Sequence, residues 1–313
     1  MSMSAKPGRV GRLRKRIRST AADVRSRLYV DRSDSRRTVF LLSSGRSGST
    51  WLSALLQSIP ATRTIFEPFH PVHGYSTLAP YRYRYISDQD DNHELDVALG
   101  SILDGTLRSS WSDQFNPILP FTFKRRLVKE VRANLLAPWL TRKQPEAKFI
   151  FLVRHPIPVA FSQLKGGWKL SSRRLLEQEP LIDESGLNAL SKFGWPDSGF
   201  ESLVLFWAIE NSVALQSARN AGAEIVRYED LVLQPQQTLK KIEKYIEADF
   251  PNTVSKRFDK SSWSSHRTVG DLSPTEKVNR WRRDASDAQL AFVADVLSTC
   301  ELGLLYDAGS ITR

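Results

Sequence analysis

A short run of small polar residues, followed by apolar residues at helical spacing, has the chemistry of an anion-binding loop. It directly follows the apolar segment 38–42 and reads Gly45-Arg46-Ser47-Gly48-Ser49-Thr50. Glycines let successive backbone N–H groups turn inward, hydroxyls add donors, and the following helix presents its positive end to an anion. The sequence therefore predicts a phosphate- or sulfate-binding cradle, against the alternative of an ordinary Ser/Gly loop with a helix cap.

The same loop lacks the lysine of nucleoside triphosphatases and nucleotide kinases, whose loop reads G-x-x-x-x-G-K-[ST]. When Gly48-Ser49-Thr50 is aligned with the end of that pattern, Ser49 takes the place of the lysine and Ser43 that of the first glycine. Because the lysine binds the β- and γ-phosphates, ordinary ATP or GTP chemistry is not expected. A nucleotide kinase with a degenerate loop is kept as an alternative.

The segment Ser44–Leu52 resembles the 5′-phosphosulfate loop of sulfotransferases that use 3′-phosphoadenylyl sulfate (PAPS). The carbohydrate branch of this family, whose loop reads Arg-Ser-Gly-Ser/Thr, is a closer match than the cytosolic enzymes. The resemblance implies a P-loop-like fold, the six loop residues 45–50 as PAPS-binding residues, and a reaction without a metal. It gives Arg46 the place of the catalytic lysine of cytosolic members, where a cation stabilises the leaving phosphate. It gives Trp51 the place of a tryptophan that stacks on adenine, with packing in the helix core as the alternative.

A second motif fits a phosphate at the other end of the same ligand. Arg154 follows the apolar run 148–153, a Pro-containing turn comes next, and Ser162 stands eight residues after the arginine. An arginine at the carboxyl end of a strand offers a bidentate fork to a phosphate. The family has this spacing at its 3′-phosphate site, so the resemblance gives Arg154 and Ser162 that role. Tyr228 lies in a Tyr-Glu-Asp segment that resembles the family's strand end near the adenine.

A basic segment near the C-terminus resembles the family's terminal motif, which closes over the 3′-phosphate. It contributes Lys277, Arg280 and Trp281 as binding residues. The glycine that usually precedes the tryptophan is missing here, so a solvated charged segment is the alternative.

Transfer to a hydroxyl needs a group that accepts its proton. In cytosolic sulfotransferases this group is a histidine two residues after a strand lysine, whereas here Val131 follows Lys129 at that spacing. Carbohydrate and some bacterial members instead carry a Glu-Pro soon after the first helix, which matches Glu67 at the end of a short strand. Glu67 is therefore the candidate base, and it is expected to be ionised among cations. Lys129 is expected either to hold the sulfate or to orient Glu67. An ion-paired or helix-capping glutamate is the alternative, and the spacing of the histidines indicates no metal site.

Strands and helices alternate along the chain, and this order positions the motifs. Strands are expected at 38–42, 127–131, 148–154 and 224–228, and helices at 51–59, 135–141, 159–165, 201–221 and 237–247. This order predicts an α/β class, a three-layer fold with a central parallel sheet flanked by helices. Ligands bind such sheets at the carboxyl ends of the strands, where the polar loops lie. Irregular insertions that bind the acceptor or form lids are expected at 69–118, 166–198 and 252–280.

The net charge of +11 is concentrated in a basic N-terminal arm, residues 1–37. The arm holds 12 Lys/Arg and 3 acidic residues, whereas the predicted sulfotransferase domain, 38–313, holds 33 and 31. Because that domain is near neutral, nucleic acid is not expected as a partner. Apolar residues at spacings of three or four fit a helix in the arm, which either lies on an anionic membrane surface or is a solvated tail.

No apolar run reaches the roughly 18 residues of a membrane span, and the N-terminus lacks the apolar core of a signal peptide. The single cysteine, Cys300, excludes an internal disulfide. We expect a cytoplasmic protein, peripheral at the membrane where the arm binds there.

These motifs together predict an enzyme that moves the sulfuryl group of PAPS to an acceptor hydroxyl. Tryptophans outside the motifs suit sugar rings, so a carbohydrate or glycolipid acceptor is preferred to other hydroxyls. The main alternative is a non-catalytic protein that binds the desulfated nucleotide PAP and uses its basic arm on membranes or nucleic acid.

Overall fold

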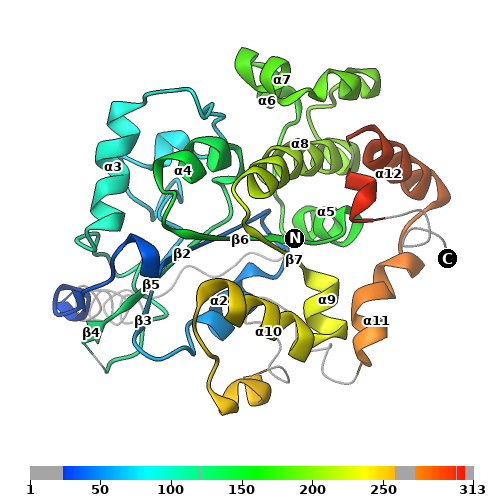
Figure 1. Ribbon diagram of the computed structural model, residues 1–313. Helices are drawn as coiled ribbons and strands as arrows, with labels where there is room; N and C mark the ends of the chain where they lie inside the picture. The colour runs from blue at the N-terminus through cyan, green and yellow to red at the C-terminus, as the bar shows by residue number, and fades with distance from the viewer. Residues whose placement is uncertain (1–23, 120, 258–271, 301, 307–313) are drawn as a thin grey trace, which may run out of the picture.

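The computed structural model describes residues 24–119, 121–257, 272–300 and 302–306. The first 23 residues of the predicted arm, and residues 258–271 of one predicted insertion, lie outside the described residues. A five-stranded sheet lies between two layers of helices, as Figure 1 shows. The predicted α/β class, with a central parallel sheet flanked by helices, is confirmed. None of the described helices is both long and apolar enough to cross a bilayer.

The central sheet is parallel, and its inner strands are buried on both faces. In spatial order it consists of β3 (Thr62–Phe66), β5 (Arg125–Glu130), β2 (Thr38–Ser43), β6 (Lys148–Val153) and β7 (Glu224–Arg227). The central strands β2 and β6 are near-continuous apolar runs because helices exclude water from both of their faces. The four strands expected at apolar runs are present, as is the short strand before Glu67. The last one ends at Arg227, so Tyr228 begins a helix instead of ending the strand.

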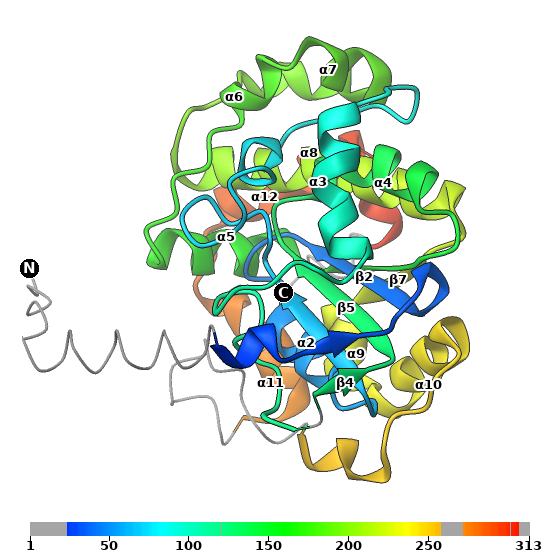
Figure 2. The same ribbon diagram turned by 90° about the vertical axis from the view of Figure 1, so that its left-hand side faces the viewer.

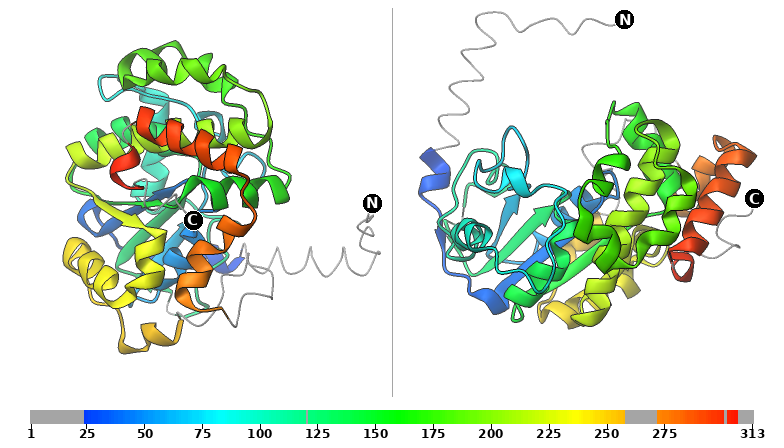
Figure 3. Two further views of the ribbon diagram at one scale, coloured as in Figure 1. Left: turned by 90° about the vertical axis from the view of Figure 1, so that its right-hand side faces the viewer. Right: turned by 90° about the horizontal axis from the view of Figure 1, so that it is seen from above.

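The helices cover the two faces of the sheet with separate hydrophobic cores. One face carries α3 (His93–Leu103), α4 (Ala137–Lys143), α5 (Pro156–Lys165), α8 (Gly199–Asn220) and α12 (Asp287–Thr299). The other carries α2 (Ser49–Leu56), α9 (Tyr228–Leu233) and α10 (Pro235–Ile246). Successive strand residues serve opposite cores, so Phe40 stacks on Phe149 in the first core while Leu41 lies in the second. Figure 3 shows α12, in the red C-terminal part of the chain, packed beside α8.

The order of the strands gives the sheet a switch point at β2. The chain passes from β2 outward to β3, returns to β5, and then crosses to β6 and β7 on the other side of β2. The connections on the two sides of β2 therefore run in opposite directions. Ligands of open parallel sheets bind outside the carboxyl ends of the strands at such a point. The loop 43–50 follows β2 and occupies this position.

The prediction that the three insertions are irregular is wrong, because each contains short helices. They are η2 (Ala79–Tyr81) and α3 in 69–118; α6 (Arg173–Leu176), α7 (Glu179–Ser185) and η4 (Leu187–Phe193) in 166–198; and η5 (Asn252–Arg257) and α11 (Pro274–Asn279) in 252–280. In α3 the Asn92 side chain caps the first turn, and Leu95, Leu99 and Ile102 form a buried stripe. Short helices gain most of their stability from tertiary packing, which the local composition does not report.

The last residues of the basic arm are fixed to the body by a buried ion-pair cluster. Strand β1 (Val30–Asp31) pairs in parallel with β4 (Thr122–Phe123). The buried carboxylate of Asp31 accepts from Arg126 Nε at 2.9 Å and pairs with Arg63 Nη1 at 3.2 Å. Because a buried charge without its partner is costly, this cluster holds the segment in one place. The boundary of the arm at residue 37 stays a prediction.

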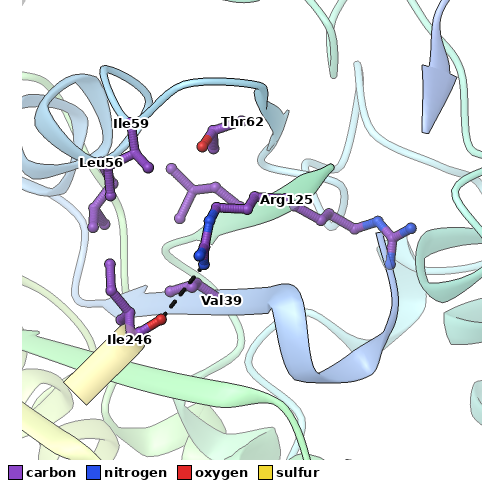
Figure 4. A pocket seen from close by; sticks show the side chains of 8 residues that line it. Val39, Leu56, Ile59, Thr62, Arg125 and Ile246 are labelled. Carbon is purple, nitrogen blue, oxygen red and sulfur yellow. Dashed lines mark hydrogen bonds between the residues drawn. The ribbon is translucent and has the colours of Figure 1, made fainter. Parts of the chain in front are cut away.

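A small apolar pocket lies at the amino-terminal end of the sheet, away from the loop 43–50 (Figure 4). Its lining residues are Val39, Leu56, Ile59, Thr62, Arg125, Arg126, Leu127 and Ile246. The Arg125 guanidinium donates to the carbonyl oxygens of Ile246 at 3.5 Å and Glu247 at 3.0 Å. It thereby caps the carboxyl end of α10, which is a structural role.

Candidate active site

The loop between β2 and α2 turns sharply, as an anion cradle requires. Two of its residues have left-handed backbone conformations, Arg46 with φ 79° and Gly48 with φ 95°. The Gly48 carbonyl accepts the N–H groups of Trp51 and Leu52, which starts α2 directly behind the loop. The hydroxyl of Ser47 is buried and makes no hydrogen bond within the described residues. The loop therefore offers a buried donor and a helix N-terminus in one place.

Both glycines of the loop lie against aromatic rings. A Cβ on Gly45 would lie 2.3 Å from the Trp168 ring, and a Cβ on Gly48 would lie 2.6 Å from the Tyr228 ring. Gln163 fixes the first of these turns, because its side-chain amide donates to the Gly45 carbonyl at 3.0 Å. Any side chain at either glycine would displace the aromatic ring or the loop.

We expect Gly48→Ala to lower the free energy of unfolding by about 1–3 kcal/mol, because a left-handed non-glycine residue alone costs about 1–2 kcal/mol. Gly100→Ala is the matched control, since a Cβ there meets nothing within 4 Å in the middle of α3. That control should be neutral or stabilising by about 0.5–1 kcal/mol. Urea denaturation of the two variants measures both values, and equal stabilities would contradict the assigned loop geometry.

Three residues predicted to bind anions meet at the ends of β2 and β6. Arg46 donates from Nε to the Ser162 hydroxyl at 2.8 Å, and Arg154 donates from Nη1 to the Arg46 carbonyl at 3.4 Å. The Arg154 guanidinium lies 4.1 Å from the centre of the Tyr228 ring, which is within reach of a cation–π interaction. Its Nε is buried without a hydrogen-bond partner among the described residues. The two motifs, more than 100 residues apart in sequence, thus form one cationic site.

Two aromatic residues stand on the α2 and α9 side of this site. Trp51 and Tyr228 are both partly exposed, and their rings meet edge to face at a centroid distance of 6.1 Å. Because Tyr228 starts α9, its ring is directed by the helix across Gly48 and not along the strand. The expected stacking of Trp51 on an adenine stays a prediction.

The C-terminal segment reaches the same end of the sheet through Trp281. This ring is buried and stacks on His155, at 4.3 Å between centroids and 18° between planes. His155 directly follows Arg154, and burial lowers its pKa to about 3, helped by the nearby charges of Arg282 and Arg154. His155 is therefore a neutral packing residue. Its stacking anchors the basic segment near Arg154.

The other two residues predicted in that segment are less enclosed. Lys277 lies half-buried on α11, and Arg280 is exposed at the start of the 3-10 helix η7 (Arg280–Arg283). Arg282 packs instead over the Trp281 ring at 5.0 Å. The roles of Lys277 and Arg280 stay predictions.

Glu67 follows β3 with a left-handed φ of 41° and lies between two cations. Lys129 Nζ hydrogen bonds with one carboxylate oxygen, and Arg132 Nη1 donates to the other at 2.8 Å. In the sheet register Phe66, Lys129 and Leu41 lie side by side. Because strands are about 4.8 Å apart, the Glu67 backbone lies about 10 Å from the end of β2.

The two cations decide the charge of Glu67. Burial would raise the pKa of this carboxyl, but Lys129 and Arg132 outweigh burial, so the pKa lies below the ordinary glutamate value. Glu67 is therefore ionised at neutral pH, as its sequence context predicted. It is also ion-paired, which was the alternative, so its role as a base stays a prediction.

A second acid beside this group, Glu130, was not among the residues predicted from the sequence. Its carboxylate accepts the N–H groups of Phe69 at 2.8 Å, Val131 at 2.7 Å and Arg132 at 3.1 Å. Burial, with the charge of Glu67 next in size, raises its pKa to about 7. Because both of its oxygens hold backbone N–H groups, Glu130 positions the segment that carries Glu67.

A third acid, Glu210, lies on α8 and contacts the start of the loop 43–50. It is fully enclosed in α8 and hydrogen bonds with Ser44, and burial raises its pKa to about 8. The neighbouring Asn211 amide donates to the Ser44 hydroxyl at 2.7 Å. Helix α8 therefore holds the start of the loop 43–50 through two consecutive side chains. The sequence does not reveal this role of Glu210 and Asn211, because both residues lie inside a long helix at positions spaced like those of the core.

Comparison with known protein families shows the family to which this site belongs. A model described as the sulfotransferase family matches residues 38–252, which is more than half of the chain. The chain belongs to the sulfotransferase family. This match covers the loop, Glu67, Arg154 and Tyr228, and it ends before the C-terminal basic segment.

Solved structures of sulfotransferases are also similar to this chain. A sulfotransferase domain from the curacin biosynthetic pathway is 17% identical, with a TM-score of 0.46, covering 84% of this chain and 96% of that one. The sulfotransferase domain of the Synechococcus PCC 7002 olefin synthase is 19% identical, with a TM-score of 0.48 and coverages of 89% and 96%. Sulfotransferase STF9 from Mycobacterium avium is 14% identical, with a TM-score of 0.46 and coverages of 98% and 84%. A comparison with curated proteins found no match.

Within this sulfotransferase, an aromatic shelf of His70, His73 and Trp111 lies beside Glu67. Each histidine ring is 4.8 Å from the Trp111 ring, and the two histidine rings are 5.0 Å apart. Trp111 Nε1 donates to the Glu67 carbonyl at 3.2 Å, so the shelf is attached to the candidate base. The shelf lies in segment 69–118 and is partly exposed to solvent.

The hydrogen bonds of His70 determine which of its nitrogens carries the proton. Its Nδ1 accepts the N–H groups of Val72 at 3.2 Å and His73 at 3.1 Å. Burial, and next the charge of Arg132, lowers its pKa below the ordinary histidine value. The neutral ring therefore has its proton on Nε2, where it donates and does not act as a base. Among the described residues, no group of three or more His, Cys, Asp or Glu is placed to hold a metal ion.

Proposed function

We propose that this sulfotransferase transfers the sulfuryl group of PAPS to a hydroxyl of a carbohydrate-containing acceptor, a glycan or a glycolipid. The observation that best supports PAPS as the sulfuryl donor is the hydrogen bond from Arg154 to the Arg46 carbonyl. It unites a helix-N-terminal cradle and a strand-end arginine, which suits a ligand with anionic groups at both its 5′ and 3′ ends. The resemblance to the carbohydrate branch in residues 44–52 supports the acceptor class.

The residues of the cradle fit such a donor. The Ser47 hydroxyl and Arg154 Nε, which have no hydrogen-bond partner in the described part of the chain, are donors that a bound anion would satisfy. Arg46 and the other loop residues of 45–50 would hold the 5′-phosphosulfate side, and Arg154 and Ser162 the 3′-phosphate. Trp51 and Tyr228 offer aromatic faces to the adenine, and Trp281 anchors the segment with Lys277 and Arg280 nearby. PAPS supplies an activated sulfuryl group with a phosphate leaving group.

The chain's own residues then have three tasks in the transfer. Glu67 accepts the proton of the acceptor hydroxyl as the new oxygen–sulfur bond forms. Arg46 and the loop N–H groups stabilise the negative charge on the leaving phosphate as the old bond breaks. Lys129, in contact with Glu67, orients the carboxylate.

The aromatic shelf supports a carbohydrate acceptor. Sugar rings present apolar C–H faces that pack on aromatic rings, and their hydroxyls need donors and acceptors beside them. Trp111 provides such a face, and His70 provides an N–H donor, both next to Glu67. An acceptor ring on this shelf would place a hydroxyl beside the candidate base.

Incubation with ³⁵S-labelled PAPS and a panel of glycans, glycolipids and phenols, in EDTA, tests the proposal. We expect label in a glycan or glycolipid product identified by mass spectrometry. Label only in phenols would overturn the acceptor class. PAP binding without any transfer would favour the non-catalytic alternative, and magnesium-dependent ATP hydrolysis would favour the degenerate kinase.

We expect Trp111→Ala to raise the KM for the acceptor about tenfold, because aromatic packing contributes about 1 kcal/mol or more beyond the buried area. The KM for PAPS should change less than twofold, since Trp111 lies on the acceptor side of Glu67. Trp111→Phe keeps an aromatic face and should recover most of the loss. Steady-state kinetics with each substrate varied in turn separates these effects, and a rise in the PAPS KM alone would contradict the shelf.

A further inference from the structure

Exposed apolar side chains gather at one edge of the described structure. Of the eleven large hydrophobic residues that are exposed among the described residues, seven come from the segments 24–30 and 115–121. They are Val24, Leu28, Val30, Phe115, Ile118, Leu119 and Phe121, and we call them the apolar edge. Ile118 and Leu119 are about two-thirds exposed, at 67% and 66%. Such a concentration marks an interaction surface, because single exposed hydrophobics are otherwise scattered.

The two segments are fixed side by side. The Val30 N–H donates to the Phe121 carbonyl at 2.7 Å, and the Tyr29 hydroxyl donates to the Pro117 carbonyl at 2.9 Å. The Tyr29 ring also packs on Phe123 at 5.1 Å between centroids. Figures 1 and 2 show the start of the described chain, in blue, beside β4 at this edge. The apolar edge is therefore a built surface and not two separate loop ends.

The surroundings of the apolar edge are cationic. Arg27, Arg32 and Lys124 are exposed within or next to the two segments. The nearby Asp31 is buried between two arginines and adds no exposed negative charge. The described chain begins at Val24, inside the apolar edge, and the preceding 23 residues include seven Lys/Arg and one Asp. The seven Lys/Arg residues of this segment therefore precede the apolar edge directly in the sequence.

We propose that the apolar edge docks this protein on an anionic lipid membrane. Apolar side chains that enter the acyl boundary, with cations around them that meet lipid phosphates, are the two attractions of peripheral binding. A second copy of the chain would fit worse, because a two-fold interface sets the same cations against one another. The arm folded back on this edge would meet the same repulsion. This proposal does not depend on the sulfuryl transfer proposed above.

Flotation of the full-length protein with vesicles tests the proposal. We expect binding to phosphatidylcholine vesicles that contain about a third phosphatidylglycerol, weakening steeply with salt, and little binding to phosphatidylcholine alone. The variant Leu28→Ser/Ile118→Ser/Leu119→Ser should bind about 30-fold or more weakly, since each side chain loses its burial in lipid. The control Val97→Ser/Leu233→Ser removes two exposed side chains from outside the apolar edge and should bind normally. Urea denaturation checks that both variants are folded.

Insertion is measured directly with a tryptophan placed at the surface. The parent protein has eight tryptophans, so its own quenching is the reference. Leu119→Trp should show additional quenching by brominated lipids in the anionic vesicles, whereas Val97→Trp should show none. Equal binding by the triple serine variant and the parent protein would overturn the proposal and leave the arm alone as the lipid-binding element. A dimer in analytical ultracentrifugation that the same triple variant abolishes would overturn it in favour of a second copy.

Discussion

Glu67→Gln should lower kcat for sulfuryl transfer by about 10²- to 10⁴-fold, the range that a general base contributes. The amide keeps the shape of the side chain but accepts no proton at neutral pH. Because the amide oxygen of this variant can still accept from Lys129 or Arg132, the site should stay assembled, and PAP affinity should change less than threefold. Rapid-quench kinetics and calorimetry with PAP measure the two quantities separately.

The pH dependence of the same reaction identifies the base. Because Lys129 and Arg132 hold the pKa of Glu67 below the ordinary value, Glu67 stays ionised as the pH falls from neutral to the ordinary glutamate range. Activity that depends on it should be kept over that window and be lost only as the pH falls through the lowered pKa. An acid limb near pH 7 or 8 would instead assign the base to Glu130 or Glu210, whose pKa values burial raises to about 7 and about 8.

A matched control separates catalysis from the loss of any carboxylate. Glu146→Gln removes an exposed glutamate that also pairs with an arginine, Arg36, at 3.0 Å. Its kcat and KM should equal those of the parent, since exposed ion pairs contribute little. Full turnover by Glu67→Gln would remove Glu67 from the mechanism while leaving the family membership unaffected.

Arg46→Ala should lower kcat by about 10²- to 10³-fold, the loss seen when one donor to a developing negative charge is removed. The Arg46 guanidinium is placed by its bond to Ser162, at the point where the loop turns. Arg46→Lys should recover part of the rate, because it restores the charge without the bond geometry. Single-turnover experiments with saturating PAPS measure the chemical step.

Arg154→Ala should weaken PAP binding, in contrast to Arg46→Ala, which should slow the chemical step. A lost charge-assisted hydrogen bond costs about 1.5–3 kcal/mol, so PAP affinity should fall roughly 10- to 100-fold. Single-turnover rates at saturation should change far less than in Arg46→Ala, because Arg154 is assigned to the far phosphate. If both variants lost only affinity, Arg46 would be a binding residue and not one that stabilises the leaving group.

The helical content of the insertions was not predicted, although α3 carries sequence signals of a helix in its Asn92 cap and its apolar residues at helical spacing. In segment 69–118, α3 forms where its Leu95, Leu99 and Ile102 stripe packs into the core. A pattern of apolar residues competes with turn residues nearby, and only the packed core decides which of them prevails. The shelf of His70, His73 and Trp111 depends on that packing, since it joins the two ends of this segment.

The sequence by itself determined the strand, loop and helix from Thr38 to Leu56, and it singled out Arg46 and Arg154, which the structure brings together. These are local signals, because apolar runs, glycines and charges act within a few residues of one another. Only the tertiary structure decided that Arg132 pairs with Glu67 across 65 positions and that Asn211 holds Ser44 across 167. The first contact arises because the parallel sheet brings distant strand ends to one edge, and the second because α8 packs against that edge. No spacing within the chain encodes either of them.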